Sequence, residues 1–341
     1  MPIFFVTGGA GFIGSAFVRL LLEEVPGSEV VNFDALTYAG NLDNLRDINN
    51  PAHRFAHGDI TDRNAVLNAL PPGADAIVNF AAESHVDRSI ASAHEFISTN
   101  VQGTQVLLDV ARERGVRRFV QISTDEVMGS LPEDEAAFFT EDSPFRPNSP
   151  YAASKAAAEH LVRAACHTFG LDTIITRCGN NYGPRQFPEK FLPLMLSNAL
   201  NDEAIPLYGD GRNVRDWIYV EDHCRAILLA LEKGRPGSVY NFGARNERRN
   251  IEIAEAVLDQ LGKPRSLIQF VKDRPGHDRR YAIDPAVAET ELGWRPRETW
   301  EIGLEKTIRW YRENAEWIAR ARSGACREFY AGQYGREVTA R

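Results

Sequence analysis

Two side chains four residues apart, Tyr151 and Lys155, are suited to proton transfer. The segment 151–169 has helical periodicity and follows Pro147 and Pro150, so both side chains should lie on one face of a helix. A free phenol, with a pKa of about 10, is a poor base at neutral pH, and a nearby ammonium stabilises the phenolate. The pair therefore predicts a tyrosine base whose pKa is lowered by the lysine.

Two adjacent acids, Asp125 and Glu126, directly follow Thr124 at the end of a predicted strand, residues 118–123. Ligands of open α/β sheets bind at the carboxyl ends of the strands, so the Thr124 hydroxyl and both acids should share a cleft with Tyr151. Two carboxyl groups in one low-dielectric site tend to separate their pKa values. This arrangement suits one proton donor and one acceptor, and the common alternative is two acids that only solvate a loop.

Three glycines, Gly8, Gly11 and Gly14, separate a short apolar segment, residues 3–7, from a helical pattern over residues 12–24. Between a strand and a helix such a turn must be tight, and its backbone N–H groups can approach a pyrophosphate. The turn therefore predicts a dinucleotide site, which includes Phe12 and Ile13.

Asp34 ends the second predicted strand, at the distance from the glycine turn where a carboxylate accepts hydrogen bonds from ribose hydroxyls. No Arg immediately follows it to receive a 2′-phosphate, so the sequence favours NAD over NADP. Asp59 and Ile60 come after the third predicted strand. There Asp59 could contact the adenine or simply cap a turn.

Apolar segments of strand type recur at residues 3–7, 29–33, 54–57, 76–80, 118–123 and 173–177, with helical patterns between most of them. Strands covered by helices on both faces read in this way, which predicts an α/β fold with a Rossmann-type, doubly wound parallel sheet. From about residue 179 the elements become shorter. We expect an NAD-binding domain over residues 1–178 and a smaller, partly interleaved C-terminal α/β substrate lobe over residues 179–341.

The 341 residues carry a net charge of −8, and 25% of them are charged. This composition is typical of a globular protein and argues against a nucleic-acid partner. The cysteines, Cys166, Cys178, Cys224 and Cys326, have no spacing that indicates a metal site or a disulfide framework. Without a signal-peptide pattern or an apolar segment of membrane-spanning length, we expect a cytoplasmic protein with no metal and no membrane contact.

The glycine turn, Asp34, Thr124 and the segment 151–155, Tyr-Ala-Ala-Ser-Lys, together resemble the extended short-chain dehydrogenase/reductase superfamily. Most members of that superfamily act on nucleotide sugars. Residues 123–127, Ser-Thr-Asp-Glu-Val, are similar to the active-site strand of the dTDP-glucose 4,6-dehydratase family. The resemblance extends from about residue 3 to residue 312 and thus covers most of the chain.

This resemblance implies a lyase reaction with a retained NAD. Tyr151 removes the C4 hydroxyl proton while hydride leaves C4, and Lys155 supports the phenolate. Glu126 then takes the C5 proton while protonated Asp125 donates a proton to the C6 oxygen as water leaves. Return of the hydride to C6 and of a proton to C5 yields a 4-keto-6-deoxy sugar, with no net consumption of cofactor. The expected substrate is dTDP-glucose.

The resemblance also implies further contacts in the cleft. Ala81, Ala82, Thr99 and Asn181 are expected at the cofactor. His85 is expected to be structural rather than a base. For Arg215 we expect a contact with the diphosphate, because a guanidinium donates two parallel hydrogen bonds. The expected substrate contacts are Ser84, Thr124, Asn180, Glu189, Lys190, Arg215, Asn250, Arg274 and His277.

One position departs from the family pattern: Met128 stands where the family usually has Tyr, and a thioether cannot donate a hydrogen bond. The preferred sugar and nucleotide therefore stay open. The alternatives are a UDP-sugar 4-epimerase, a 4,6-dehydratase of another nucleotide sugar, and a non-catalytic NAD- or nucleotide-sugar-binding sensor. The helical segments 100–114 and 151–169 resemble those that form a four-helix contact in this superfamily, so we expect a homodimer.

Overall fold

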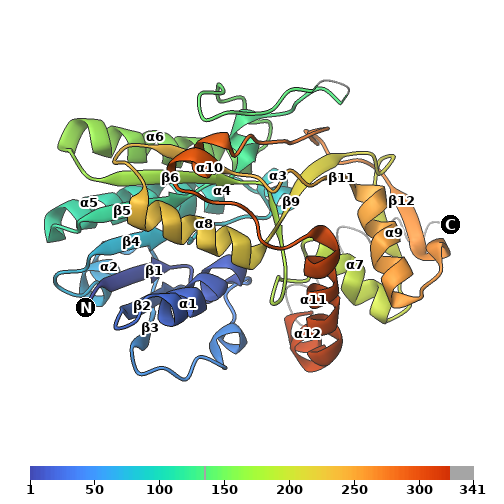
Figure 1. Cartoon of the computed structure of the whole chain (residues 1–341), viewed down its shortest axis with the longest axis horizontal. Helices are drawn as coiled ribbons and strands as arrows, with labels where there is room; N and C mark the ends of the chain where they lie inside the picture. Colours follow the sequence, from blue (N-terminus) through green and yellow to red (C-terminus); the bar gives the residue numbers. More distant parts are fainter. Residues whose placement is uncertain (134–135, 323–341) are drawn as a thin grey trace.

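A sheet of seven parallel strands occupies the larger lobe of the computed structural model, which describes residues 1–133 and 136–322 (Figure 1). The strand order is β10-β6-β5-β4-β1-β2-β3. In the register of the central strands, Val6 of β1 pairs with Asn32 of β2 on one side and with Val78 of β4 on the other. The strands are β1 (Ile3–Thr7), β2 (Glu29–Asp34), β3 (His53–His57), β4 (Ala76–Asn79), β5 (Arg118–Ile122), β6 (Thr173–Cys178) and β10 (Val239–Phe242).

Helices cover both faces of this sheet, as the apolar strands predict. Along β1, Phe4 and Val6 pack under α1 (Phe12–Glu24) and α8 (Val220–Lys233). Phe5 points to the opposite face, because successive strand residues alternate, and packs with the second helical layer. That layer consists of α2 (Arg63–Ala69), α5 (Thr104–Arg114) and α6 (Pro150–Phe169).

Several short helical elements lie between the longer ones. The expected helix over residues 100–114 is found as α5, preceded by a π-helical segment, η2 (Ile97–Gly103). The other short elements are η1 (Leu42–Leu45), α3 (Val86–Ala91), α4 (His94–Phe96), η3 (Asp125–Met128), η4 (Arg265–Leu267) and α10 (Ala286–Glu291).

The smaller lobe lies at the right of Figure 1 and has its own core of aromatic rings. Tyr182, Trp217 and Trp300 meet there, with ring centroids 5.0–6.3 Å apart. Its strands form a three-stranded sheet in the order β11-β9-β7 and a separate pair, β12-β8. The elements are β7 (Asn180–Tyr182), α7 (Phe191–Leu200), β8 (Ile205–Tyr208), β9 (Val214–Tyr219), β11 (Glu247–Arg249), α9 (Asn250–Leu261), β12 (Ile268–Val271), α11 (Trp300–Glu313) and α12 (Ala315–Ala321).

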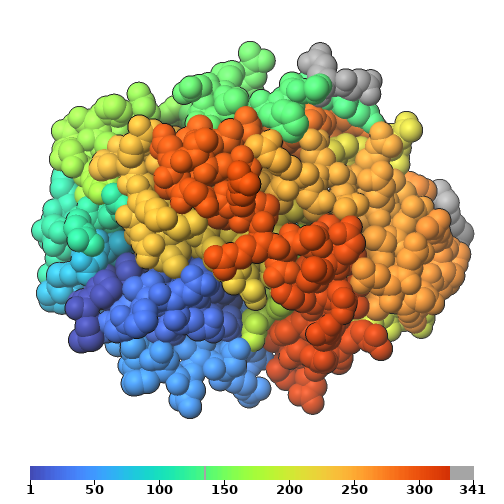
Figure 2. Space-filling model, in the orientation of Figure 1, coloured from blue at the N-terminus to red at the C-terminus, as the bar shows by residue number. Residues whose placement is uncertain are grey.

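Contacts between segments far apart in the chain join the two lobes. Trp317 in α12 donates its indole N–H to Asn44 (3.0 Å), and Arg320 pairs with Asp43 (2.7 Å). Figure 2 shows the red surface of the last helices beside the blue N-terminal segments. The two lobes are therefore held together on the side where α12 meets η1.

The predicted Rossmann-type architecture is confirmed. The expected boundary at residue 178 stays a prediction, and the interleaving is visible in β10 and α8, which come from beyond it and complete the main sheet. Cys166, Cys178 and Cys224 are free thiols, and Cys326 lies outside the described residues.

Two phenylalanines allow a matched test of this packing. Phe17 on α1 is fully buried and packs against Phe80, whereas Phe169 at the end of α6 is 55% exposed. Phe17→Ala is expected to lower the free energy of unfolding by about 3–5 kcal/mol, because it leaves a cavity in the core. Phe169→Ala should cost less than about 1 kcal/mol. Urea unfolding monitored by circular dichroism measures both, and equal losses would contradict the placement of α1.

Candidate active site

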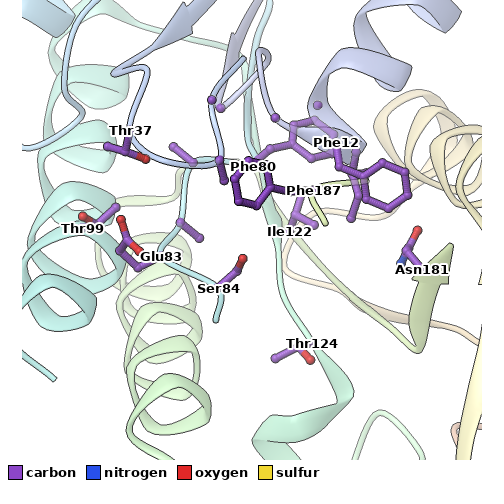
Figure 3. A pocket seen from close by; sticks show the side chains of 18 of the residues that line it. Phe12, Thr37, Phe80, Glu83, Ser84, Thr99, Ile122, Thr124, Asn181 and Phe187 are labelled. Carbon is purple, nitrogen blue, oxygen red and sulfur yellow. The ribbon is translucent and has the colours of Figure 1, made fainter. Parts of the chain in front are cut away.

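A cavity of about 310 Å³ lies at the carboxyl end of the parallel sheet, where the two lobes meet. Figure 3 shows Phe12, Phe80 and Phe187 on one side of it, and Thr99 and Glu83 on the other. Most of the residues predicted from the sequence line this one space: Gly8, Gly11, Phe12, Ile13, Gly14, Asp34, Asp59, Ile60, Ala81, Ala82, Ser84, Thr99, Thr124, Asp125, Glu126, Tyr151, Lys155, Asn180, Asn181, Glu189 and Lys190.

The glycine turn can fold tightly against its own neighbours only because side chains are absent from it. Gly8 has a φ of +70°, and a Cβ there would lie 2.6 Å from the Ala81 nitrogen. At Gly14 a Cβ would lie 2.3 Å from the Gly8 oxygen. The turn is thus tightly folded before α1, and its open backbone at the cavity fits the pyrophosphate of a dinucleotide.

Asp34 and Asp59 border the same end of the cavity. The Asp34 carboxylate accepts hydrogen bonds from the backbone N–H groups of Ala10 (2.9 Å) and Leu36 (2.8 Å). These bonds fix the carboxylate and leave lone pairs for ribose hydroxyls. Asp59 caps a turn by accepting from the Thr61 N–H (2.8 Å), so the alternative of turn capping is present, and Asp59 also faces the cavity.

Helix α6 carries the predicted tyrosine and lysine into the cavity. Ser149 caps this helix by accepting from the Ala152 N–H (3.1 Å), and Pro150 occupies its first turn. The ammonium of Lys155 donates to the Ile122 carbonyl at the end of β5 (2.6 Å). Burial lowers the pKa of Lys155 to about 8.

The electrostatics of Tyr151 differ from the expectation. Burial raises the pKa of its phenol well above the usual value, and the charge of Glu126 raises it further. A hydrogen bond with Thr124 has a smaller, opposite effect. The prediction that Lys155 lowers the pKa of Tyr151 is therefore wrong for the protein without ligands. The Lys155 ammonium bonds to the Ile122 carbonyl, and desolvation of the phenol is the larger effect.

The two acids occupy a turn of 3₁₀-helix, η3, immediately after β5. Thr124 caps this turn by accepting from the Glu126 N–H (3.3 Å) and donates to the Asp125 carboxylate (3.3 Å). Burial, followed by the charge of Glu126, raises the pKa of Asp125 well above its usual range. Burial also raises the pKa of Glu126, but the cations Arg274, Arg215 and Lys190 oppose that rise.

This asymmetry separates the pKa values of the two carboxyl groups, in the direction that the sequence predicted. Asp125 is 2% exposed, and its Oδ2 has no hydrogen-bond partner among the described residues. A neutral carboxylic acid is the favoured form there. Glu126 faces the cations and is the group more easily ionised. The site can therefore offer one proton donor and one proton acceptor side by side.

Two charged side chains from the second lobe, Glu189 and Lys190, line the cavity. Lys190 donates to the Ser84 carbonyl (2.5 Å), and Glu189 pairs with Arg88 (3.1 Å). Tyr38 stacks against the same guanidinium, with Arg88 Cζ 4.2 Å from the ring centroid. The loop after β4 is thereby tied to the segment before α7.

Four predicted substrate residues, Arg215, Asn250, Arg274 and His277, do not line the cavity. Arg215 is held by backbone carbonyls, including that of Asp278 (2.9 Å), and Arg274 pairs with Asp87 (3.3 Å). Both guanidinium groups nevertheless act on the pKa of Glu126. His277 bonds to Asp273 (2.6 Å). The structure thus places Arg215 and Arg274 beside the lined space.

Asn250 begins α9, where its backbone N–H donates to the Asn213 carbonyl (3.0 Å). Met128 is buried, with 2% of its surface exposed, among Val127, Phe139 and Tyr281. Its sulfur accepts a hydrogen bond from Arg177 (3.7 Å). The substitution of Met for Tyr thus falls in the core behind the acids rather than in the cavity lining. A changed sugar contact at Met128, which the sequence suggested, does not follow from this position.

Several cavity residues were missed by the sequence reasoning. Glu83, Phe187 and Cys178 line the cavity, and Tyr38 and Arg88 stand behind Glu189. Glu83 stands between Ala82 and Ser84, both of which are predicted contacts, so its position carried a signal. Tyr38 lies in an irregular loop with no pattern that marks it. His85 is buried at the start of α3, which agrees with the expected structural role.

Two features are absent from the described residues, 1–133 and 136–322. Among them no helix has the length and apolar character to cross a membrane. Within the same ranges no group of three or more His, Cys, Asp or Glu side chains is arranged to hold a metal ion.

Comparisons with known proteins agree with this geometry. A family model described as GDP-mannose 4,6 dehydratase matches residues 5–307. A dTDP-glucose 4,6-dehydratase of Escherichia coli is 49% identical, over 96% of this chain and 97% of its own. DesIV, a dTDP-glucose 4,6-dehydratase from Streptomyces venezuelae solved with NAD and dTDP bound, is 52% identical, with a TM-score of 0.91 over 94% of this chain and 99% of its own.

A more distant structure shares the scaffold. The UDP-glucose 4-epimerase of Thermus thermophilus, solved as a complex with NAD, is 33% identical, with a TM-score of 0.84 over 92% of this chain and 99% of its own. The Escherichia coli and Streptomyces venezuelae proteins, which match at about half identity over nearly the whole length, are both dTDP-glucose 4,6-dehydratases. The chain therefore belongs to the dTDP-glucose 4,6-dehydratase family, within the extended short-chain dehydrogenase/reductase superfamily.

Proposed function

We propose that this protein is an NAD-dependent lyase that converts dTDP-glucose to dTDP-4-keto-6-deoxyglucose. The observation that carries this proposal is the asymmetric acid pair: Asp125 is buried and favoured as a neutral acid, while cations hold the pKa of Glu126 closer to its usual value. Dehydration needs such a pair, because hydroxide is a poor leaving group and the C5 proton must be removed at the same time. Family membership supports the same reaction.

In the proposed reaction the residues of this chain move protons and hold the sugar. Tyr151 accepts the C4 hydroxyl proton, and the Thr124 hydroxyl orients the sugar oxygen beside it. After C4 is oxidised, Glu126 removes the C5 proton and Asp125 protonates the departing C6 oxygen. NAD held at the glycine turn and Asp34 would supply the hydride acceptor for C4 and the hydride donor for C6. As C6 is reduced, Glu126 returns its proton to C5.

Lys155 has two parts in this proposal: it carries a positive charge below its pKa of about 8, and it fixes the end of β5 through the Ile122 carbonyl. Only the phenolate of Tyr151 can accept the C4 proton, and burial raises the pKa of the phenol in the protein alone. We therefore propose that the phenolate forms in the complex with NAD and substrate, where the positive charges of Lys155 and of the nicotinamide ring would stabilise it.

The remaining predicted residues are proposed as binding contacts. At the cofactor these are Gly8, Gly11, Phe12, Ile13, Gly14, Asp34, Asp59, Ile60, Ala81, Ala82, Thr99 and Asn181. At the substrate they are Ser84, Asn180, Glu189, Lys190, Arg215, Asn250, Arg274 and His277. The charges of Arg215 and Arg274 act on Glu126. Each guanidinium already has a protein partner, the Asp278 carbonyl for Arg215 and the Asp87 carboxylate for Arg274, and would keep it while meeting a diphosphate. We also propose a cytoplasmic homodimer that uses α5 and α6.

The alternatives differ from this proposal in what the acids must do. An epimerase on the same scaffold needs the tyrosine and the cofactor but no second proton donor at C6. A sensor needs neither Tyr151 nor the acid pair, and all of these groups line the cavity. A dehydratase of another nucleotide sugar uses the same acids, so only the nucleotide contacts would distinguish it.

The direct experiment is product analysis. Purified protein is incubated separately with dTDP-glucose and with UDP-glucose, and the alkali-induced absorbance of a 4-keto-6-deoxy sugar is recorded. We expect product from dTDP-glucose at a much higher kcat/KM. Formation of a C4 epimer without this chromophore would show an epimerase, and preference for UDP-glucose would change the substrate.

Replacement of the proposed base should divide the reaction after its first step. Glu126→Gln is expected to permit C4 oxidation and to block elimination, so reduced cofactor accumulates while product formation falls by roughly 10²–10⁴-fold. Absorbance of the reduced nicotinamide in a single turnover measures this. Glu232→Gln, an exposed residue of α8, is the matched control. Full turnover by the Glu126 variant would remove this residue from the mechanism.

Replacement of the phenol should act one step earlier. Tyr151→Phe keeps the ring in the same pocket but cannot accept the C4 proton, so the first hydride transfer should slow by roughly 10²–10⁴-fold. Reduced cofactor should therefore not accumulate when substrate is added in a single turnover. If it forms at the wild-type rate, another group removes the proton.

A further inference from the structure

Helix α6 presents three ionisable side chains to β5 at intervals of four residues: Tyr151, Lys155 and Glu159. Residues at this spacing lie on one face of a helix. The first two belong to the proposed site, whereas Glu159 is 2% exposed and does not line the cavity. A buried carboxylate one helical turn beyond Lys155 requires compensation, because burying an unpaired charge is costly.

Glu159 has two buried partners, and both lead to the proposed site. Its Oε1 accepts from the hydroxyl of Ser123 (2.5 Å), the residue immediately before Thr124. Arg177 in β6 donates Nε to both oxygens (3.1 Å each) and Nη2 to Oε2 (2.8 Å), which is a bidentate ion pair. Arg177 is 3% exposed, and it also donates to the Glu141 carbonyl (3.1 Å).

Two successive turns of α6 therefore hold two successive residues, the last residue of β5 and the residue that follows the strand. Lys155 bonds to the Ile122 carbonyl (2.6 Å), and Glu159 bonds to the Ser123 hydroxyl (2.5 Å). These bonds fix the strand end at the point where Thr124 begins the acidic turn. A displacement of this strand end would move the acids relative to Tyr151 and the sugar.

We propose that Glu159, paired with Arg177, is a positioning residue of the dehydratase reaction, which joins the strand end that carries Thr124, Asp125 and Glu126 to the helix that carries Tyr151 and Lys155. The inference rests on the proposed function for its kinetic consequence. Its structural consequence can be measured on Lys155 without turnover.

Electrostatics add a second effect to this mechanical one. The groups that face Lys155 are Glu159 and Tyr151 on its own helix and Cys178 from β6, with the acidic turn beyond Tyr151. Burial lowers the pKa of Lys155, and the carboxylate of Glu159 is the first of the effects that raise it again. Removal of that charge should lower the pKa further, so that the ammonium loses its proton at a lower pH.

The experiment compares three variants with the wild type. Glu159→Gln removes the carboxylate but leaves the Arg177 charge buried and unpaired, which can prevent folding. The double variant Glu159→Gln/Arg177→Met removes both charges and keeps side chains of similar length. The matched control is Glu113→Gln. Glu113 lies on the neighbouring helix α5, and the change breaks its exposed ion pair with Arg63 of α2. Folding is checked by circular dichroism and thermal unfolding.

Two readouts are recorded on each folded variant. The first is the pKa of Lys155, from NMR titration of protein labelled at the lysine ε-carbon, with the signal assigned through Lys155→Arg. The second is the pH profile of kcat and KM with dTDP-glucose. In the Glu159 variants we expect the pKa of Lys155 to fall below its value of about 8, and the alkaline limb of kcat to move the same way. The kcat should drop roughly tenfold or more with little change in KM.

The outcomes separate the two proposals. An unchanged Lys155 titration and an unchanged kcat in the folded double variant, equal to those of Glu113→Gln, would overturn the role of Glu159. A uniform loss of kcat with no movement of the Lys155 titration or the pH profile would also overturn it, since that indicates only a structural defect. A lowered Lys155 pKa in a protein whose wild type forms no keto-sugar would support the coupling and refute the dehydratase assignment.

Discussion

Desolvation at the carboxyl end of β5 is the constraint on which the chemistry of this protein depends. Burial is the largest cause of the altered pKa values of Asp125, Glu126, Tyr151 and Lys155. It raises the pKa of Asp125, Glu126 and Tyr151 and lowers the pKa of Lys155, so all four side chains are pushed toward their neutral forms. Neighbouring charges then decide which of them is ionised most easily.

The two lobes contribute to that decision in different ways. The Rossmann lobe supplies the acids and the buried strand ends around them, whereas Lys190, Arg215 and Arg274 come from the second lobe and oppose the rise in the pKa of Glu126. The contact between the lobes therefore places cations beside the proposed base. At Asp125 the largest effect of a neighbouring charge comes from Glu126 itself, and together with burial it favours the neutral acid.

Much of the fold and the site followed from the sequence because local patterns are decisive there. The apolar strands, the glycine turn and the four-residue spacing of Tyr151 and Lys155 all depend on neighbouring residues, and the structure brings them to one cavity. The direction of the Tyr151 pKa could not be predicted, because it depends on burial and on where the Lys155 ammonium bonds. Tyr38 and Arg88 meet only through long-range packing.

The protonation of the acid pair is the measurement that tests this account most directly. Infrared spectra of the wild type, Asp125→Asn and Glu126→Gln at neutral pH would show the C=O stretching band of any protonated carboxyl group. The account predicts such a band that is lost in Asp125→Asn and kept in Glu126→Gln, because burial, the larger cause, remains in the second variant. A band that survives in Asp125→Asn but disappears in Glu126→Gln would contradict the assigned division between acid and base.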